Sequence, residues 1–137
     1  EKESVLSIYL TNRKHTQAEP ISAESAEGAD ELYKAGLFDQ AAKSYEQLIK
    51  KAPKNSQAYA GLGKVYIQQS KFEQAAGVLH QAIRYNPTTP SHYANLGIAL
   101  LGLKDYPEAA KAFEQALKLR PDNQRYQQLY QLAKKGG

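Results

Sequence analysis

Apolar residues recur along this chain at spacings of three and four, the pattern of one face of an amphipathic helix. After Ser56, the expected N-cap, the spaced positions hold Tyr59, Leu62, Gly63, Tyr66 and Ile67. A short polar turn follows, and a second apolar face comprises Phe72, Ala75, Ala76, Leu79, Ala82 and Ile83. This helix is expected to stop before Pro87, because the residue preceding a proline disfavours helical geometry. The pattern therefore predicts two helices joined by a tight turn.

The whole pattern returns after 34 residues. Pro53, Pro87 and Pro121 are separated by this interval (87 − 53 and 121 − 87), and so are Ala41, Ala75 and Ala109. A fixed period of this length is typical of stacked-repeat solenoids. We therefore expect an all-α, right-handed helical-repeat solenoid of three helix-turn-helix repeats plus a C-terminal capping helix. The expected divisions are an N-terminal extension or linker over residues 1–21, repeats over 22–55, 56–89 and 90–123, and the capping helix and tail over 124–137.

Helix ends are marked by residues with known capping preferences. Thr89 is expected to cap the first helix of the third repeat, with Pro90 in its first turn, where a missing N–H costs nothing. Asp122 or Asn123 is expected to cap the last helix, and Gly36 to terminate the first helix of the first repeat. That first helix fits the pattern least well, as is common in terminal repeats.

The repeated frame resembles the tetratricopeptide repeat family, and the resemblance covers residues 22–135. In that family large residues stand at positions 4, 7, 11 and 24 of the 34-residue unit, small residues at 8, 20 and 27, and proline at 32. The copy beginning at Ser56 carries Tyr59, Leu62, Gly63, Tyr66, Ala75, Leu79, Ala82 and Pro87 at these positions. The copy beginning at Pro90 carries Tyr93, Leu96, Gly97, Leu100, Ala109, Phe113, Ala116 and Pro121. The copy beginning at Ser22 matches partly.

The resemblance implies a function in protein–protein interaction, with a partner peptide or protein held in a concave groove lined by the first helix of each pair. The implied groove residues are Tyr33, Gln57, Lys64, Ile67, Gln68, Asn95, Ile98, Leu101 and Arg125. Lys64, Asn95 and Arg125 are expected to meet an acidic side chain or a terminal carboxylate. For Ile98 and Leu101 there is an alternative, in which they pack against the next helix.

One branch of the resembled family clamps the C-terminal carboxylate of chaperone tails. The five clamp positions, counted from the second copy, hold Ala60, Lys64, Asn95, Arg125 and Leu129 here. Only Asn95 matches outright, and Arg125 conserves the charge of its position. We therefore do not expect this chain to form that clamp.

The sequence contains few residues suited to catalysis or metal binding. Cysteine is absent, which excludes a disulfide framework, a thiolate metal site and a cysteine nucleophile. His80 and His92 are expected at the surface, and no histidine has a second ligand at metal-like spacing. No phosphate-binding loop and no pairing of a nucleophile with a base is visible. We expect a non-catalytic module without a cofactor or a metal.

Charge adds one alternative function. Residues 22–55 carry six acidic and five basic side chains, whereas residues 124–137 carry three basic and no acidic ones. Head-to-tail self-association is therefore the alternative, as is exchange of the N-terminal segment, whose apolar cluster lies within residues 5–10. The net charge of +4 is mild and forms no basic stripe, so nucleic-acid binding is not expected.

The expected location is the cytoplasm by default, because neither a signal peptide nor a membrane-spanning run is present. The chain lacks an initiator Met, and we expect a fragment of a longer protein. Membrane attachment would then come only from parts outside it.

Overall fold

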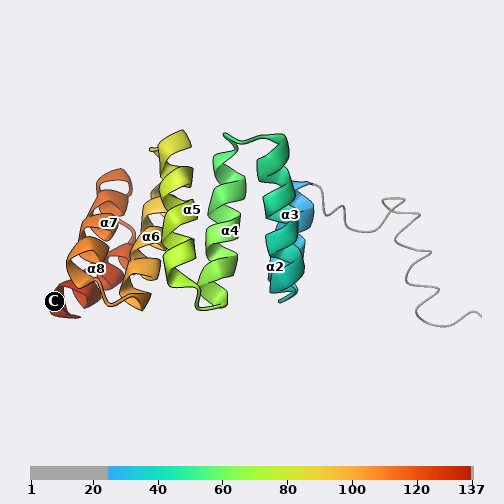
Figure 1. Cartoon of the computed structure of the whole chain (residues 1–137). Helices are drawn as coiled ribbons and strands as arrows, with labels where there is room; N and C mark the ends of the chain where they lie inside the picture. Colours follow the sequence, from blue (N-terminus) through green and yellow to red (C-terminus); the bar gives the residue numbers. More distant parts are fainter. Residues whose placement is uncertain (1–24, 137) are drawn as a thin grey trace, which may run out of the picture.

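The computed structural model describes residues 25–136, and within them seven α-helices and no strand are present. The helices are α2 (Ala26–Lys34), α3 (Phe38–Lys51), α4 (Ser56–Gln68), α5 (Phe72–Tyr85), α6 (Pro90–Gly102), α7 (Tyr106–Leu119) and α8 (Gln124–Gly136). They follow one another side by side from α2 at one end of the stack to α8 at the other (Figure 1). The prediction of an all-α helical-repeat solenoid is confirmed. The expectations for residues 1–21 lie outside the described residues.

The apolar core is distributed along the stack, and each part of it joins neighbouring helices. One cluster joins α2, α3 and the inner face of α4; it includes Leu32, Tyr45 and Val65. Further clusters join α4 to α7 and then α7 to α8. Ala41, Ala75 and Ala109, one in each pair, are fully buried. Small residues at these positions let the helices approach closely, as the repeated pattern predicts.

The recurring prolines hold the connections between helix pairs through one repeated hydrogen bond. The Tyr59 hydroxyl donates to the carbonyl oxygen of Pro53 at 2.8 Å. The Tyr93 hydroxyl donates to the carbonyl of Pro87 at the same distance. After the third proline, Gln127 Nε2 takes the place of the tyrosine and donates to the carbonyl of Pro121 at 2.9 Å. A backbone carbonyl in the loop between two helix pairs is thereby hydrogen-bonded each time.

The helix caps correct two sequence predictions. Asn55 rather than Ser56 is the N-cap of α4, and its side chain accepts from the amide of Ala58 at 3.2 Å. Thr89 occupies the N-cap position of α6, but its side chain makes no capping hydrogen bond. Asn123, one of the two expected residues, caps α8 by accepting from the Tyr126 amide at 2.9 Å. Asn is among the strongest N-cap residues, which explains its use before both α4 and α8.

Candidate functional site

Seven of the nine predicted groove residues line one pocket of about 300 Å³. They are Tyr33, Lys64, Ile67, Gln68, Asn95, Ile98 and Arg125. They come from α2, α4, α6 and α8, the first helix of each pair and the capping helix. A helical period of 3.6 residues places positions 5, 6, 9, 12 and 13 of each repeat near one face, so the stack aligns these faces. We call this set the groove pocket.

The polar side chains of the groove pocket carry positive charge without a matching acid. Lys64 Nζ lies 4.7 Å from the centroid of the Tyr33 ring, a cation–π contact. Gln68 Nε2 donates to the Tyr33 hydroxyl at 3.4 Å. Arg125 is exposed and contributes the second cation, and no Asp or Glu is among the lining residues. The pocket therefore offers donors to an anionic or carbonyl-bearing ligand.

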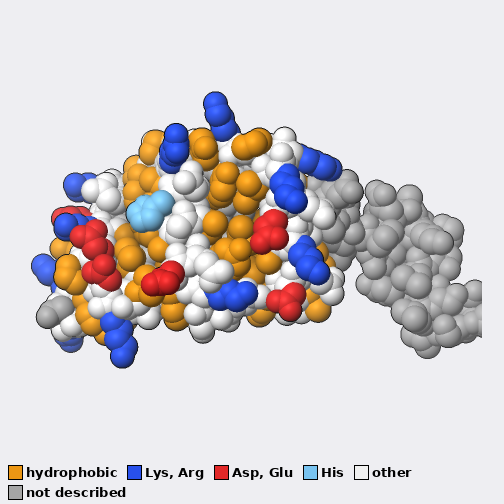
Figure 2. Space-filling view, in the orientation of Figure 1, with side chains coloured by type: hydrophobic (Ala, Val, Ile, Leu, Met, Phe, Trp, Pro, Cys, Tyr) orange, Lys and Arg blue, Asp and Glu red, His pale blue; other side chains and the backbone are white. Residues whose placement is uncertain are grey.

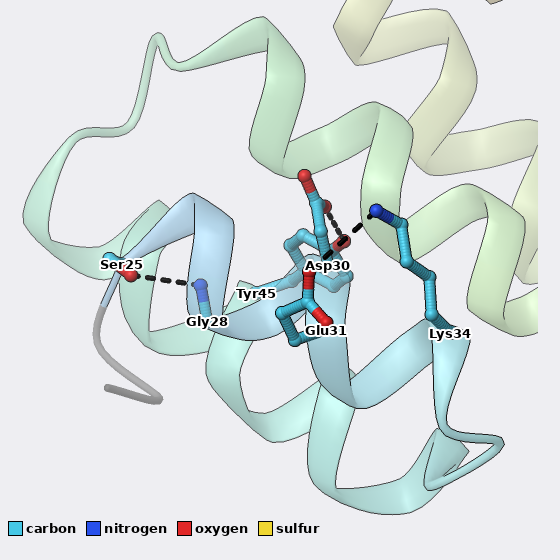
Figure 3. A network of polar contacts seen from close by, with 6 residues as sticks. All are labelled: Ser25, Gly28, Asp30, Glu31, Lys34 and Tyr45. Carbon is cyan, nitrogen blue, oxygen red and sulfur yellow. Dashed lines mark hydrogen bonds and ion pairs between the residues drawn. The ribbon is translucent and has the colours of Figure 1, made fainter. Parts of the chain in front are cut away.

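At the α2 end, an acidic side chain is already occupied by a tyrosine. Tyr45 on α3 donates its hydroxyl hydrogen to Asp30 Oδ1 on α2 (Figure 3). Burial, and then the bond to Asp30, raise the pKa of Tyr45 well above its usual range, so the phenol stays a donor. This link between Asp30 and Tyr45 was not predicted from the sequence. It limits how far Asp30 is free to meet a ligand.

The neighbouring charges on α2 face solvent. Glu31 and Lys34 form an ion pair at 3.7 Å with both side chains more than half exposed, so its contribution to stability is small. The Ser25 side chain caps the helix by accepting from the Gly28 amide at 2.9 Å. The acidic character of this end of the stack is therefore a property of its outer surface.

Two predicted groove residues lie elsewhere. Gln57 is exposed in the first turn of α4 and does not line the groove pocket. Leu101 is half-buried against the cluster of Ala109, Phe113 and Ala133, and it lines a separate hollow beside α8. Ile98 contacts the same cluster while also lining the groove pocket. The alternative of packing against the next helix therefore describes Leu101 well and Ile98 in part.

The positions of the chaperone-tail clamp are only partly available. Lys64, Asn95 and Arg125 share the groove pocket. Ala60 is buried and has no polar side chain. Leu129 packs against the buried cluster of α7 and α8. Two of the five clamp positions therefore supply no hydrogen-bond donor from their side chains.

The surface prediction for His92 is wrong. His80 is exposed, but the His92 side chain is only 1% exposed at the start of α6. Both ring nitrogens of His92 are buried without a hydrogen-bond partner, and burial lowers the pKa of this histidine. The sequence contained a signal for this: the residue 34 positions earlier is Ala58, a small apolar residue.

Other kinds of site find little support in the described part of the chain. Residues 25–136 contain no group of three or more His, Cys, Asp or Glu side chains that could hold a metal ion. Across the same residues, none of the helices combines the length and the apolar character needed to cross a membrane.

Comparison with known proteins supports the repeat assignment. A family model described as Tetratricopeptide repeat matches residues 27–70 and 61–124. Among curated proteins, no relative matches the chain.

Solved structures give similar folds. The second TPR domain of human RPAP3, in complex with the HSP70 peptide SGPTIEEVD, is 27% identical, with a TM-score of 0.77, over 88% of this chain and 97% of that one. The TPR domain of Arabidopsis OM64 is 25% identical, with a TM-score of 0.78, over 80% and 91% of the two chains. A mutant O-GlcNAc transferase of Thermobaculum terrenum is 26% identical, with a TM-score of 0.75, over 79% of this chain and 21% of that one.

Proposed function

The chain belongs to the tetratricopeptide repeat family, and from that premise we propose that its groove pocket holds an extended segment of a partner protein. In this proposal the chain is a non-catalytic adaptor or assembly module. The observation that carries it is the convergence of Tyr33, Lys64, Asn95 and Arg125, from four different helices, on one pocket. Side chains that the sequence separates by up to 92 positions (125 − 33) are brought to a common surface.

The chemistry of the pocket favours an acidic segment. Two cations and the Asn95 amide face a space with no carboxylate among its lining residues. An arginine can bind a carboxylate with two parallel hydrogen bonds, which adds geometry to charge. Ile67 and Ile98 offer apolar contacts beside these donors. The proposed ligand is thus an extended peptide with an acidic residue and a neighbouring aliphatic one.

The similar RPAP3 domain supports a peptide ligand of this kind. Its bound peptide, SGPTIEEVD, contains two glutamates and a C-terminal aspartate. Two of the five clamp positions, Ala60 and Leu129, supply no hydrogen-bond donor from their side chains, so we propose an acidic peptide other than that tail. The SGPTIEEVD peptide is therefore a useful weak-binding reference for this chain.

An array of nine-residue peptides of varied charge, followed by fluorescence anisotropy on the strongest binders, tests the proposal. We expect binders rich in Asp and Glu, and about tenfold weaker binding for Lys64→Gln and for Arg125→Gln, since a charged hydrogen bond contributes roughly 1.5–3 kcal/mol. Lys118→Gln and Arg120→Gln, which remove exposed cations outside the pocket, serve as matched controls. Binding that is equally weakened by the controls, or unaffected by both pocket variants, would contradict the proposal.

Self-association is the second candidate, and a specific surface favours it. Leu132 on α8 is 56% exposed, the most exposed of the large hydrophobic side chains described. It borders two hollows, of about 380 and 420 Å³, that also include Lys135. The basic α8 end and the acidic α2 end of a second copy have complementary charge.

Light scattering after size-exclusion chromatography, at low and high salt, tests this candidate. We expect a salt-sensitive oligomer that Leu132→Glu abolishes. A salt-insensitive oligomer lost on removal of residues 1–20 would instead favour exchange of the N-terminal segment. A monomer under all conditions would exclude both routes and leave peptide binding as the function to test.

A further inference from the structure

Two corresponding clefts lie between the second helices of successive pairs, away from the groove pocket. Figure 2 shows hydrophobic side chains, with charged ones around them, on the face of the stack where α3, α4, α5 and α7 are seen in Figure 1. The α5–α7 cleft has a volume of about 430 Å³ and is lined by His80, Ile83, Tyr93, Leu96, Leu100, Asp105, Glu108, Lys111, Ala112 and Gln115. The α3–α5 cleft has a volume of about 410 Å³ and is lined by Asp39, Ala42, Lys43, Glu46, Tyr66, Gln69, Lys71 and Gln74.

A tyrosine of the chain itself is the floor of the α3–α5 cleft. The Tyr66 hydroxyl donates to Glu46 Oε2 at 3.3 Å, and Lys71 Nζ lies 5.9 Å from the centroid of the ring. The phenol is thus held between an acceptor on one helix and a cation in the following turn. This cleft shows how the repeat frame accommodates a tyrosine side chain.

The α5–α7 cleft lacks that ring. The residue 34 positions after Tyr66 is Leu100, which has no aromatic ring and no hydroxyl. As a result the α5–α7 cleft reaches down to Leu96 and Tyr93. The corresponding Leu62 and Tyr59 do not line the α3–α5 cleft. The apolar floor that a tyrosine covers in the second pair is therefore open in the third.

At two corresponding positions, the rim of the α5–α7 cleft is acidic and the rim of the α3–α5 cleft is basic or neutral. Asp105 stands in the place of Lys71, and Glu108 in the place of Gln74. Asp105 accepts from the Glu108 amide at 3.4 Å, and Glu108 pairs with Lys111 at 3.1 Å. Each carboxylate has acceptor sites beyond these contacts, because an ionised carboxylate offers about four lone pairs.

A ring that carries a hydrogen-bond donor matches both the floor and the rim. In this molecule two tyrosine hydroxyls, those of Tyr45 and Tyr66, already donate to carboxylates. An added phosphate on such a ring would meet Asp105 and Glu108 with like charge and would be repelled.

We propose that the α5–α7 cleft is a second binding site, which takes an unmodified tyrosine side chain of a partner protein. The ring lies on Leu96 and Leu100, and its hydroxyl donates to the carboxylate of Asp105 or Glu108. This site is independent of the groove pocket, since no residue lines both.

Amide chemical-shift titrations of the full chain test the site with three small probes: N-acetyl-tyrosinamide, N-acetyl-phosphotyrosinamide and N-acetyl-leucinamide. With the tyrosine probe at millimolar concentration, we expect saturable shifts at the amides of Leu96, Leu100 and Lys111. The phosphorylated probe and the leucine probe should give at least several-fold smaller shifts. Equal responses to all three probes would overturn the proposal.

Leu100→Tyr is the decisive variant, because it copies Tyr66 into the third pair and fills the cleft from within. We expect it to remove the shifts while the helical circular dichroism is retained. Asp105→Asn is the second variant: asparagine still caps a helix, as Asn55 does, but the carboxylate is lost. This variant should weaken the binding of the tyrosine probe several-fold. Full binding by both folded variants would overturn the proposal, and Lys64→Gln in the groove pocket should bind the probe unchanged.

Discussion

The second helix pair, α4 and α5, and the third, α6 and α7, share one backbone frame but fill it with different side chains at several positions. Fully buried Ala58 of the second pair corresponds to buried His92 in the third, and Leu79 corresponds to Phe113. Half-buried Tyr66 corresponds to half-buried Leu100. At these three positions the third pair has the larger groups in the core and the smaller one beneath the cleft, whereas at another core position fully buried Val65 corresponds to the smaller Ala99.

This difference shows which parts of the repeat are fixed. Prolines and small residues set the path of the chain, and they recur in both pairs. The large side chains vary as long as the space between the helices is filled. The consequence for function is that the same fold presents two clefts of different depth, with Asp105 and Glu108 in one at the positions that hold Lys71 and Gln74 in the other.

The largest effect is expected where a glycine meets the varying core residue. A Cβ added at Gly97 would lie 2.5–2.8 Å from carbons of the Phe113 ring, and one at Gly63 would lie 2.6–3.0 Å from carbons of Leu79. Both side chains are fully buried, but the Phe113 ring is rigid, whereas Leu79 has other rotamers. We expect Gly97→Ala to lower the free energy of unfolding by about 3 kcal/mol and Gly63→Ala by about 1–2 kcal/mol.

Urea denaturation of the two variants measures this difference, and Gly77→Ala is the matched control. Gly77 is exposed within α5, and an added Cβ there would have no atom within 4 Å. Alanine is the better helix former, so this control should gain roughly 0.5–1 kcal/mol. A Gly97→Ala variant as stable as the control would show that the third pair does not pack as closely as described.

The next effect concerns His92 and depends on pH. Burial lowers the pKa of His92 below the usual value of 6.5. Above pH 6.5 the imidazole is neutral in both states, and its contribution to stability is fully present. Between 6.5 and the lowered pKa of the folded state, the unfolded chain binds a proton that the folded chain does not. As the pH is lowered through this range, the free energy of unfolding therefore decreases, by at most about 1.4 kcal/mol per pH unit.

His92→Ala, which copies Ala58, isolates this effect. The variant is expected to be less stable near neutral pH because it leaves a cavity, but its stability should decline less as the pH falls from 7 to 5, through and below the usual histidine pKa of 6.5. His80→Gln removes an exposed histidine and should keep the pH dependence of the parent chain. If His92→Ala and the parent have parallel pH profiles, His92 does not remain neutral in the folded state.

The sequence predicted the helices well because their signals are local and occur three times. Pro87 ends α5 and Asn123 begins α8 through contacts within a few residues, and a fixed period confirms each assignment against the next copy. The expected groove residues came instead from the resemblance to the tetratricopeptide repeat family, whose frame implies which positions face the concave side. Seven of the nine, Lys64 and Asn95 among them, line one pocket in the structure.

What the sequence could not predict depends on how the helices sit against one another. Tyr45 reaches Asp30 across two helices, and Leu101 packs beneath α8 while Ile98 still lines the groove pocket. These outcomes follow from the angles between helices, which no spacing encodes. His92 was misassigned for another reason. As a polar residue it was expected at the surface, although Ala58, its counterpart in the second pair, occupies a buried position.

The smallest effect is expected at the turns inside the helix pairs, where three different residues adopt one conformation. Gly36, Ser70 and Lys104 stand 34 residues apart and have φ values of 80°, 59° and 61°. In the second pair the Lys71 amide bonds to the Tyr66 carbonyl at 2.8 Å, and in the third pair the Asp105 amide bonds to the Leu100 carbonyl at 2.9 Å. These bonds satisfy carbonyls at the C-terminal ends of α4 and α6, and they require a residue with positive φ in the turn.

Ser70→Gly and Lys104→Gly should therefore each raise the free energy of unfolding by about 0.5 kcal/mol. Relief of the left-handed strain, about 1–2 kcal/mol, is partly offset by the greater freedom of glycine in the unfolded chain. Gly36→Ala should have the opposite sign and cost about 1 kcal/mol. Shifts of the urea midpoint at constant slope measure all three. Because the second and third turns have nearly the same φ, unequal gains would mean that the side chain of Ser70 or Lys104 itself stabilises its turn.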